Sequence, residues 1–331
     1  MLLVTNGDLA AERIEEVVPS GDVLPWRDVL YEGPVEAGLS DRELGEERAR
    51  FLADRGWASA DETARSFAER DAVLADFARH DEVVLFFEHD LYDQLQLIQV
   101  LDRFLGWDLD STRLSLVVAD EYLGDLGPER LQALFESRRE VTDDDFVLAC
   151  RAWEAFRSPH PTRISMLLDD GTFALPFLRP ALSRHLEQFP STENGLTRSE
   201  RRAMEAISGG RDVLSEVYVA SHQEREDPVF LGDTVFASYV EDLSDAETPL
   251  VEFEGGETIR APRVDEGELE FWDKKATLTE AGQKVLGCER DRVELNGIDR
   301  WLGGVHLVGE DTWRWDRADR ALERQPRSSD P

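Results

Sequence analysis

Three consecutive ionisable residues, Glu88, His89 and Asp90, directly follow an unbroken apolar run, Val83–Phe87. A histidine between two carboxylates can divide acid and base roles, and the same three groups can hold a divalent metal. The alternative is structural: Asp90 caps the next helix, Glu88 forms a salt bridge and His89 is an ordinary polar residue. Both interpretations stay open from these residues alone.

The elements on either side predict how this triplet is positioned. Val83–Phe87 is typical of a strand buried on both faces of a parallel sheet. A helix is expected from Leu91 to Leu105, because apolar residues recur there at the spacing of one buried face. Ligands of open α/β sheets bind beyond the carboxyl ends of the strands, which is where the triplet would lie.

Polar residues also follow the other predicted strands, Met1–Thr5, Gly21–Trp26 and Arg113–Ala119. Helices alternate with these strands, so the sequence predicts a Rossmann-like, mostly parallel α/β sheet. We expect Asp8 to cap a helix at 9–18. The candidate ligand-binding residues at the strand ends are Asn6, Gly7, Asp8, Arg27, Asp28, Glu32, Glu88, His89, Asp90, Gln94, Asp120 and Glu121.

The charge of these strand ends limits the ligand. They carry seven carboxylates against one obvious cation, Arg27, so a bare phosphate would be repelled unless a metal intervened. A hydroxyl-rich ligand, an amine or a metal-bridged phosphate would fit, and a divalent metal is the candidate cofactor. The chain has no GxxxxGK[ST], GxGxxG or GxSxG motif, which disfavours P-loop NTPases, dinucleotide oxidoreductases and α/β-hydrolases.

The composition is strongly acidic, with 71 Asp and Glu against 37 Lys and Arg and a net charge of −34. Only three of the basic residues are lysines. Acid spread over the whole chain with few lysines favours adaptation to molar salt over a specific cation-binding surface. Two isolated cysteines and no apolar run of membrane-spanning length favour a cytoplasmic protein that does not bind membranes.

The rest of the chain is predicted to be helical and then mixed. Three helices at 198–207, 212–223 and 233–242, an extended stretch at 268–272 and a helix at 277–286 give the outline of a winged helix. Strands are expected at 293–296, 304–308 and 312–315. The predicted domains are 1–125, a Rossmann-like α/β domain; 126–190, a helical segment packed on it; 191–318, a winged-helix-like α+β domain; and 319–331, a tail.

A second group of charged residues lies in the predicted winged-helix-like domain. Positive charge on a wing is what contacts to nucleic-acid phosphates require. The alternatives are chance clustering and a protein-interaction module, and the stretch 296–306 is interpreted as a tight hairpin with a packed Trp301. The candidate nucleic-acid-binding residues are Arg198, Arg201, Arg202, Lys274, Lys275 and Lys284.

Three short motifs carry a resemblance to a known family. They are Gly7-Asp8 after the first strand, Gly33-Pro34 after the second and Glu88–Leu97 after the third. With these motifs the first third of the chain resembles the DUF-1835 group, a family of unknown function. The resemblance implies a short α/β domain with a polar strand end running into a Gln/Leu-rich helix, and it implies no reaction.

Two functions are therefore expected. The first is a regulatory protein that binds a small polar ligand at the strand ends and contacts DNA or a protein partner through 191–318. The alternative is a metal-assisted hydrolase or transferase acting on a nucleotide- or sugar-like substrate, with Glu88, His89 and Asp90 as metal ligands or base and Arg27 as an electrophilic clamp. The oligomeric state, the ligand and any DNA site cannot be read from these residues.

Overall fold

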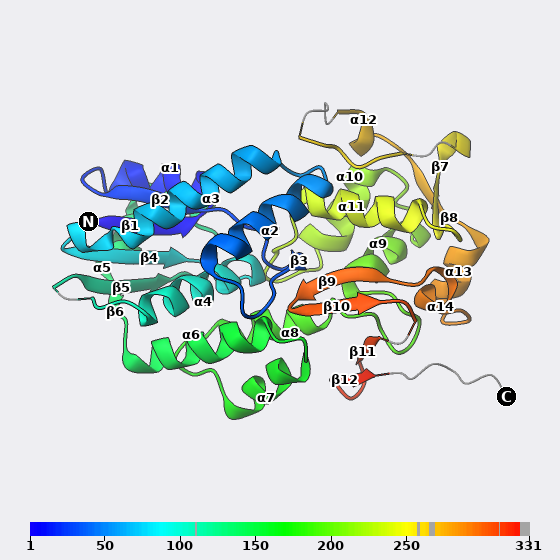
Figure 1. Ribbon diagram of the computed structural model, residues 1–331. Helices are drawn as coiled ribbons and strands as arrows, with labels where there is room; N and C mark the ends of the chain where they lie inside the picture. Colours follow the sequence, from blue (N-terminus) through cyan, green and yellow to red (C-terminus); the bar gives the residue numbers. More distant parts are fainter. Residues whose placement is uncertain (110, 257–258, 265–268, 311, 325–331) are drawn as a thin grey trace.

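The computed structural model of the chain describes residues 1–109, 111–256, 259–264, 269–310 and 312–324. It is a mixed α/β structure. A mostly parallel sheet covered by helices lies at one side, and a second, largely helical half lies beyond the carboxyl edge of that sheet (Figure 1).

Five strands form the N-terminal sheet. Neighbouring strands are parallel except the last, β6, which is antiparallel to β5. This order confirms the predicted mostly parallel sheet. Strand β1 lies between β2 and β4, so the chain leaves the β1 and β4 ends toward opposite faces, which makes these two ends a topological switch point. The order across the sheet is β2 (Asp22–Trp26), β1 (Leu2–Asn6), β4 (Glu82–Phe87), β5 (Arg113–Val118) and β6 (Arg139–Glu140).

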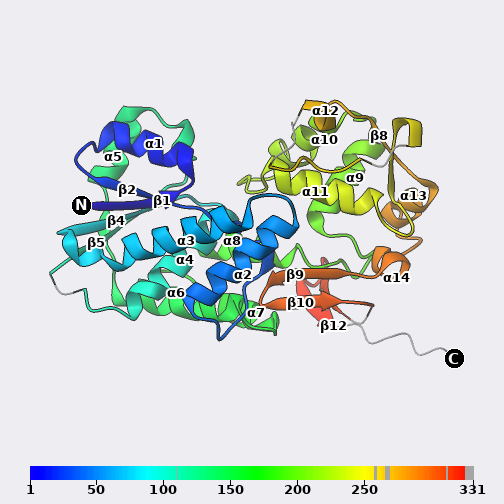
Figure 2. The same ribbon diagram turned by 45° about the horizontal axis from the view of Figure 1, so that its top comes forward.

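Helices cover both faces of this sheet (Figure 2). Strand β4 is buried along its whole length, as its apolar run predicts: Val84 and Phe86 pack toward α1 and α5, and Val83 and Leu85 pack into the larger core on the other face. The helices are α1 (Asp8–Val17) and α5 (Pro128–Glu136) on one face, and α2 (Asp41–Asp54), α3 (Ala60–Ala75), α4 (Leu91–Leu105) and α6 (Asp143–Phe156) on the other side.

Helix starts follow local capping chemistry. A capping box fixes the first turn of α2, where the Ser40 hydroxyl accepts from Glu43 N and the Glu43 carboxylate accepts from Ser40 N. At α1 the prediction that Asp8 is the cap is wrong. Gly7 is the cap residue, with φ +42°, and Asp8 is the first helical residue, whose carboxylate instead pairs with Arg27.

The second half contains a group of helices with two short strands and, at its end, two hairpins. Strands β7 and β8 pair antiparallel, as do β9 with β10 and β11 with β12. The further elements are α7 (Thr162–Asp170), α8 (Leu178–Leu186), α9 (Arg198–Ser208), α10 (Leu214–Tyr218), a π turn η3 (Val219–Gln223), α11 (Asp233–Ser244), β7 (Val251–Phe253), α12 (Leu269–Trp272), β8 (Ala276–Leu278), α13 (Glu280–Leu286), α14 (Arg292–Asn296), β9 (Asp299–Gly303), β10 (Val305–Val308), β11 (Trp313–Asp316), β12 (Ala321–Arg324) and the short turns η1 (Phe77–Arg79), η2 (Leu123–Asp125) and η4 (Glu254–Gly256).

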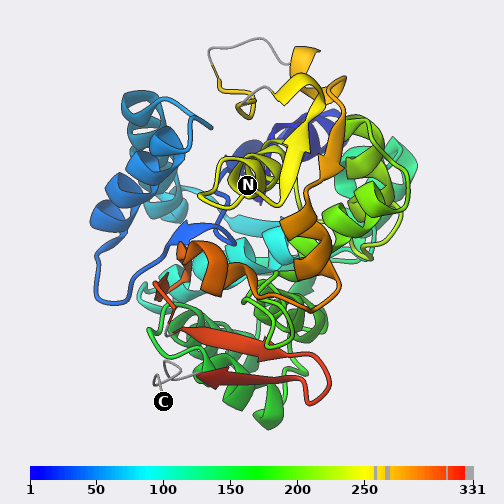
Figure 3. The ribbon, with the colours of Figure 1, turned by 90° about the vertical axis from the view of Figure 1, so that its right-hand side faces the viewer.

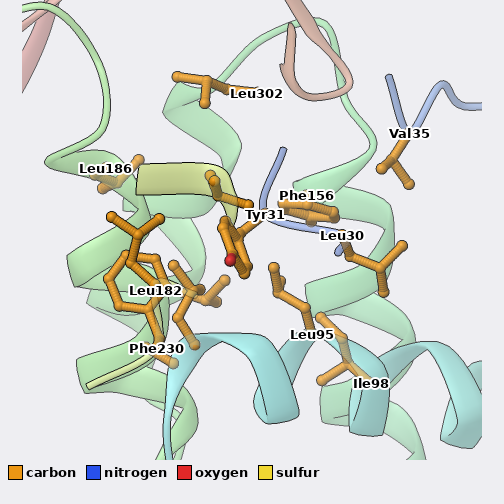
Figure 4. Packing of buried hydrophobic residues seen from close by; sticks show 14 of the residues in the cluster. Leu30, Tyr31, Val35, Leu95, Ile98, Phe156, Leu182, Leu186, Phe230 and Leu302 are labelled. Atoms are coloured by element: carbon orange, nitrogen blue, oxygen red, sulfur yellow. The ribbon is translucent and has the colours of Figure 1, made fainter. Parts of the chain in front are cut away.

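The two halves share one apolar core and one small sheet. Figure 4 shows Tyr31, Leu95, Phe156, Phe230 and Leu302 converging from distant parts of the chain. The small sheet forms because strand β3 (Gly33–Pro34) pairs in parallel with β9. The backbone of Gly303 and Gly304, at the end of β9, lies so close to the end of α6 that a Cβ at either position would clash.

Two predicted strands of the second half are wrong. The stretch Val293–Asn296 is helix α14, because the Asp291 carboxylate accepts from Val293 N and Glu294 N and so starts a helix. The extended prediction at 268–272 is replaced by the short helix α12, and its first residue lies outside the described residues, as does most of the predicted tail. The strand predicted at 312–315 is confirmed as β11 within one residue.

Candidate functional site

Three buried carboxylates meet at the carboxyl end of β4. One oxygen each of Glu88, Asp90 and Asp93 lies within 4.8 Å of the others. The three residues are 5%, 5% and 0% exposed. We call these three residues the carboxylate cluster. It lies at the switch point between β1 and β4, where α/β sheets place their ligands.

The local sequence folds these side chains together. Asp90 is the N-cap of α4, and its Oδ1 accepts from Asp93 N at 2.9 Å. Asp93 in turn accepts from Glu88 N at 2.7 Å, so the first turn of the helix is tied back to the end of the strand. Glu88 and Asp90 were predicted as site residues, and Asp93 was missed.

Neighbouring strand ends contribute hydrogen-bond donors to the cluster. From the end of β1, Asn6 Nδ2 donates to Asp93 Oδ2 at 2.6 Å. From the loop after β5, Leu123 N donates to Glu88 Oε1 at 2.8 Å. These donors are neutral, and within the described parts of the chain no arginine or lysine forms an ion pair with the cluster. The negative charge of the cluster is therefore not balanced by the protein groups seen around it.

The electrostatics of the cluster follow from that imbalance. Burial raises the pKa of Glu88 to about 6, although the hydrogen bond from Leu123 N acts against it. Burial and the charge of Glu88 raise the pKa of Asp90 to about 7. Burial, with the charges of Asp90 and Glu88, holds the pKa of Asp93 well above its usual range. Protons or a bound cation would each relieve this repulsion.

Two carbonyl oxygens beside the cluster have no hydrogen-bond partner. They are Oδ1 of Asn6 and Oε1 of Gln94, both buried. The amide nitrogens of the same side chains donate to Asp93 and to the carbonyl oxygen of Glu88, so both oxygens lie close to the cluster. Carboxylate and amide oxygens are the ligands of hard cations such as Mg²⁺, Mn²⁺ and Ca²⁺. The residues present therefore fit a divalent cation of this class.

His89 lies beside the cluster but outside the group of possible metal ligands. Its ring packs against Tyr122 and Phe177, with centroids 5.3 and 5.8 Å away. Burial lowers its pKa, although Asp120 and Asp227 act in the opposite direction. Burial thus favours the neutral ring, and its Nδ1 has no hydrogen-bond partner.

The other predicted residues of the strand ends do not join the cluster. Arg27 and Asp8 form an exposed ion pair with each other. Asp28 is buried against Arg48, with Nη2 and Oδ1 2.8 Å apart. These pairs hold the segment after β2 in place, and they leave Arg27 without the free guanidinium that a substrate clamp needs.

Glu32, Asp120 and Glu121 also have other surroundings. Glu32 is buried where the two halves meet and accepts from Arg300 and from the Tyr239 hydroxyl. Asp120 is exposed. Glu121 pairs with Arg130 at 2.6 Å. Of the predicted edge, the ends of β1 and β4 converge on the cluster, and the loop after β5 reaches it through its backbone.

The predicted nucleic-acid-binding residues separate into two places. Lys275 pairs with Asp212 at 3.0 Å, and Lys284 pairs with Glu280 at 2.6 Å. Lys274 lies two residues before the start of β8. The three arginines Arg198, Arg201 and Arg202 lie at the start of α9, in ion pairs with glutamates. The six residues therefore do not form one basic surface.

Comparisons with known proteins give no family. No family model matches the chain, and no curated protein matches it. One solved structure with partial similarity is the DNA-binding, cleavage and re-ligation domain of topoisomerase II from Plasmodium falciparum, at 12% identity and a TM-score of 0.43. The alignment covers 86% of this chain and about half, 47%, of that one. A likeness of this degree does not establish a shared fold. Within the described residues, no helix is long and apolar enough to cross a membrane.

Proposed function

We propose that the carboxylate cluster binds a divalent cation of the Mg²⁺ or Mn²⁺ class, and that the protein is a metal-assisted hydrolase or transferase acting on a nucleotide- or sugar-like substrate. The observation that carries this proposal is the group of three buried carboxylates without a cationic partner among the described residues. Burying such charges is costly unless they are neutralised.

The surrounding residues would each have a part in this function. When bound, the cation would act as a Lewis acid toward a substrate oxygen. Asn6 and the amide of Leu123 hold Asp93 and Glu88 in fixed orientations, as outer residues do in metal sites. The neutral imidazole of His89 can accept a proton at its unpartnered Nδ1.

Calorimetric titration of the full chain with MnCl₂ in molar KCl tests the proposal. We expect one site per chain, and we expect Asp93→Asn to weaken its affinity at least tenfold, because a charged ligand is removed. Glu121→Gln is the matched control, since it removes a carboxylate near the same edge that already pairs with Arg130. Equal binding by wild type and Asp93→Asn, or no binding by wild type, would contradict the proposal.

A second candidate function is the regulatory one, favoured by the order of elements after Thr197. Helices α9, α10 and α11 precede the β7–β8 pair, and an isolated bridge between Val213 and Lys275 adds a third extended segment. This order is compatible with the proposed winged-helix-like domain and supports it as a candidate. Because Lys275 and Lys284 are already paired with carboxylates, a protein partner suits this region better than DNA.

A mobility-shift assay of the full chain separates the two partners of this regulatory candidate. We expect no retention of a random-sequence duplex above that of an equally acidic control protein. A retained duplex whose binding is lost in Lys275→Gln, but not in Arg151→Gln, would show DNA binding through the wing instead. Arg151 is a suitable control because it is also paired with one carboxylate, that of Asp170.

A further inference from the structure

A cavity of about 380 Å³ outside the carboxylate cluster is lined by six arginines. It lies where the end of α8, the start of α9 and the β11–β12 hairpin meet. Figure 3 shows the red hairpin beside the green helices. Such a concentration of positive charge is not expected by chance in a chain with a net charge of −34. The six residues are Arg198, Arg201, Arg202, Arg225, Arg317 and Arg320.

The carboxylates around this arginine cavity do not balance its charge. Four glutamates, at positions 187, 193, 205 and 226, pair with five of the six arginines. One of them, Glu226, is also shared with Arg184, which does not line the cavity. At the start of α9 the positive end of the helix dipole adds to the potential. The cavity therefore favours an anion.

Arg320 is the arginine without a carboxylate partner among the described residues. It lies in the turn between β11 and β12 and lines the cavity. Its backbone has φ +52°, a left-handed conformation that costs a non-glycine residue about 1 kcal/mol or more. Glycine would suit this turn better, so an arginine here is explained better by its guanidinium than by the turn.

A second cavity of about 630 Å³ adjoins the arginine cavity and shares Glu187, Arg198, Trp315 and Arg320 with it. Its lining includes apolar side chains such as Phe230. It extends to Leu91, the first residue of α4 and the neighbour of Asp90 in the carboxylate cluster. Both volumes lie in the range of small-molecule sites, about 300–1,000 Å³.

We propose that the arginine cavity binds the phosphate of an organic phosphate whose uncharged part lies in the adjoining cavity toward Leu91. Guanidinium groups match phosphate oxygens in pairs, and a mixed polar and apolar lining suits a nucleoside or sugar. That this molecule is the substrate rests on the proposed function of the carboxylate cluster. The binding of its phosphate in the arginine cavity does not depend on that function.

The present ion pairs indicate which carboxylates the phosphate would replace. Glu193 contacts both Arg201 and Arg317, at 2.6 and 3.3 Å, and its side chain is 42% exposed, so it can turn into solvent. Glu226 is 2% exposed and stays as a buried anchor for Arg202 and Arg184. Glu193 thus pairs with two guanidinium groups that a phosphate in the cavity would need, so it should compete with phosphate.

Calorimetric titrations of the full chain with pyrophosphate, adenosine 5′-monophosphate and glucose 6-phosphate test this proposal at two KCl concentrations. Arg201→Gln and Arg320→Gly should each weaken binding about tenfold or more, since each removes charged hydrogen bonds to the anion. Arg320→Gly also suits the left-handed turn, so the fold should persist. Glu193→Gln should tighten binding several-fold, and Arg151→Gln, a paired arginine elsewhere, should have no effect.

No binding of any of the three probes by wild type, or equal binding by Arg201→Gln, would overturn the proposal. Binding of a single-stranded oligonucleotide with no binding of the monophosphates would also overturn it, in favour of a nucleic-acid surface. Phosphate binding that depends on Arg201, together with no divalent-cation binding, would leave the arginine site standing and remove the proposed enzyme function.

Discussion

Strand β4 carries a buried glutamate at each end, and the two have opposite surroundings. Glu82, just inside the amino end, accepts hydrogen bonds from Arg113, Arg138 and the Ser115 hydroxyl. Glu88, at the carboxyl end, accepts one backbone amide and lies beside two further carboxylates. The same chemical group on one strand is therefore balanced at one edge of the sheet and unbalanced at the other.

The pKa values follow the surroundings. Burial alone would raise the pKa of Glu82, but the hydrogen bonds from Arg138 and Arg113 lower it to about 2. At Glu88 burial dominates and the pKa rises to about 6. An edge that only had to fold would be expected to resemble the amino end. Carboxylates with strongly raised pKa values cluster at functional sites, so the carboxyl end supports the proposed cation site.

The largest change in the free energy of unfolding is expected for Glu82, at the amino end of β4. Glu82→Gln should lower the free energy of unfolding by about 2–3 kcal/mol at pH 7, because it leaves two arginines without their shared carboxylate. Urea unfolding at fixed KCl concentration measures this change. Glu121→Gln, which breaks an exposed pair with Arg130, should cost less than about 1 kcal/mol. Equal effects of the two variants would mean that Glu82 does not stabilise the fold through its pairs with Arg113 and Arg138.

At the carboxyl end of β4, replacing a carboxylate by an amide should raise the free energy of unfolding, whereas at the amino end it should lower it. The folded-state pKa of Asp90, about 7, lies above its ordinary 3.8. In the metal-free protein the Asp90 carboxyl therefore supports the folded state fully below pH 4, where it is protonated in both states. The free energy of unfolding then falls as the pH rises to about 7, because the unfolded state loses this proton first. Asp90→Asn should therefore stabilise the metal-free protein by about 1–2 kcal/mol at pH 8 and change little at pH 4, since asparagine caps a helix equally well.

Urea unfolding in EDTA at pH 4 and pH 8 measures the Asp90→Asn effect. Asp291→Asn is the matched control, because Asp291 also caps a helix but pairs with Arg314, so this change should destabilise. Saturating MnCl₂ should remove the advantage of Asp90→Asn by stabilising the wild type. A destabilised Asp90→Asn protein in EDTA at pH 8 would contradict the unbalanced charge of the carboxylate cluster.

The carboxyl end of β4 could be predicted in part from the sequence, because it depends on local patterns. The apolar run of β4 predicted a buried strand, and the polar residues after it predicted a site at its end. The capping boxes that start α2 and α6 are also local sequence patterns. Asp93 has a local signal too, the three-residue spacing from Asp90 at a helix start, but this spacing is also ordinary capping chemistry.

What could not be predicted depends on contacts between distant segments. The identity of the balancing groups is of this kind: Arg48 meets Asp28, and Arg300 meets Glu32 from 268 residues away. No pattern near Asp28 or Glu32 distinguishes a buried ion pair from a ligand-binding carboxylate. Three members of the arginine cavity, Arg198, Arg201 and Arg202, were predicted as nucleic-acid-binding residues, but the cavity was not predicted, since its other arginines come from later segments that fold back.

The smallest effect should come from the exposed pair at the end of β2. Arg27→Gln removes the partner of Asp8, whose pKa is lowered chiefly by that hydrogen bond. The pair is well exposed, with side chains 47% and 65% accessible, so its loss should cost less than about 1 kcal/mol. If the carboxylate cluster is the functional part of this edge, manganese affinity should also be unchanged in a calorimetric titration. A tenfold loss of affinity would instead extend the site from β4 across β1 to β2, and the guanidinium of Arg27 would have to leave Asp8 to take part.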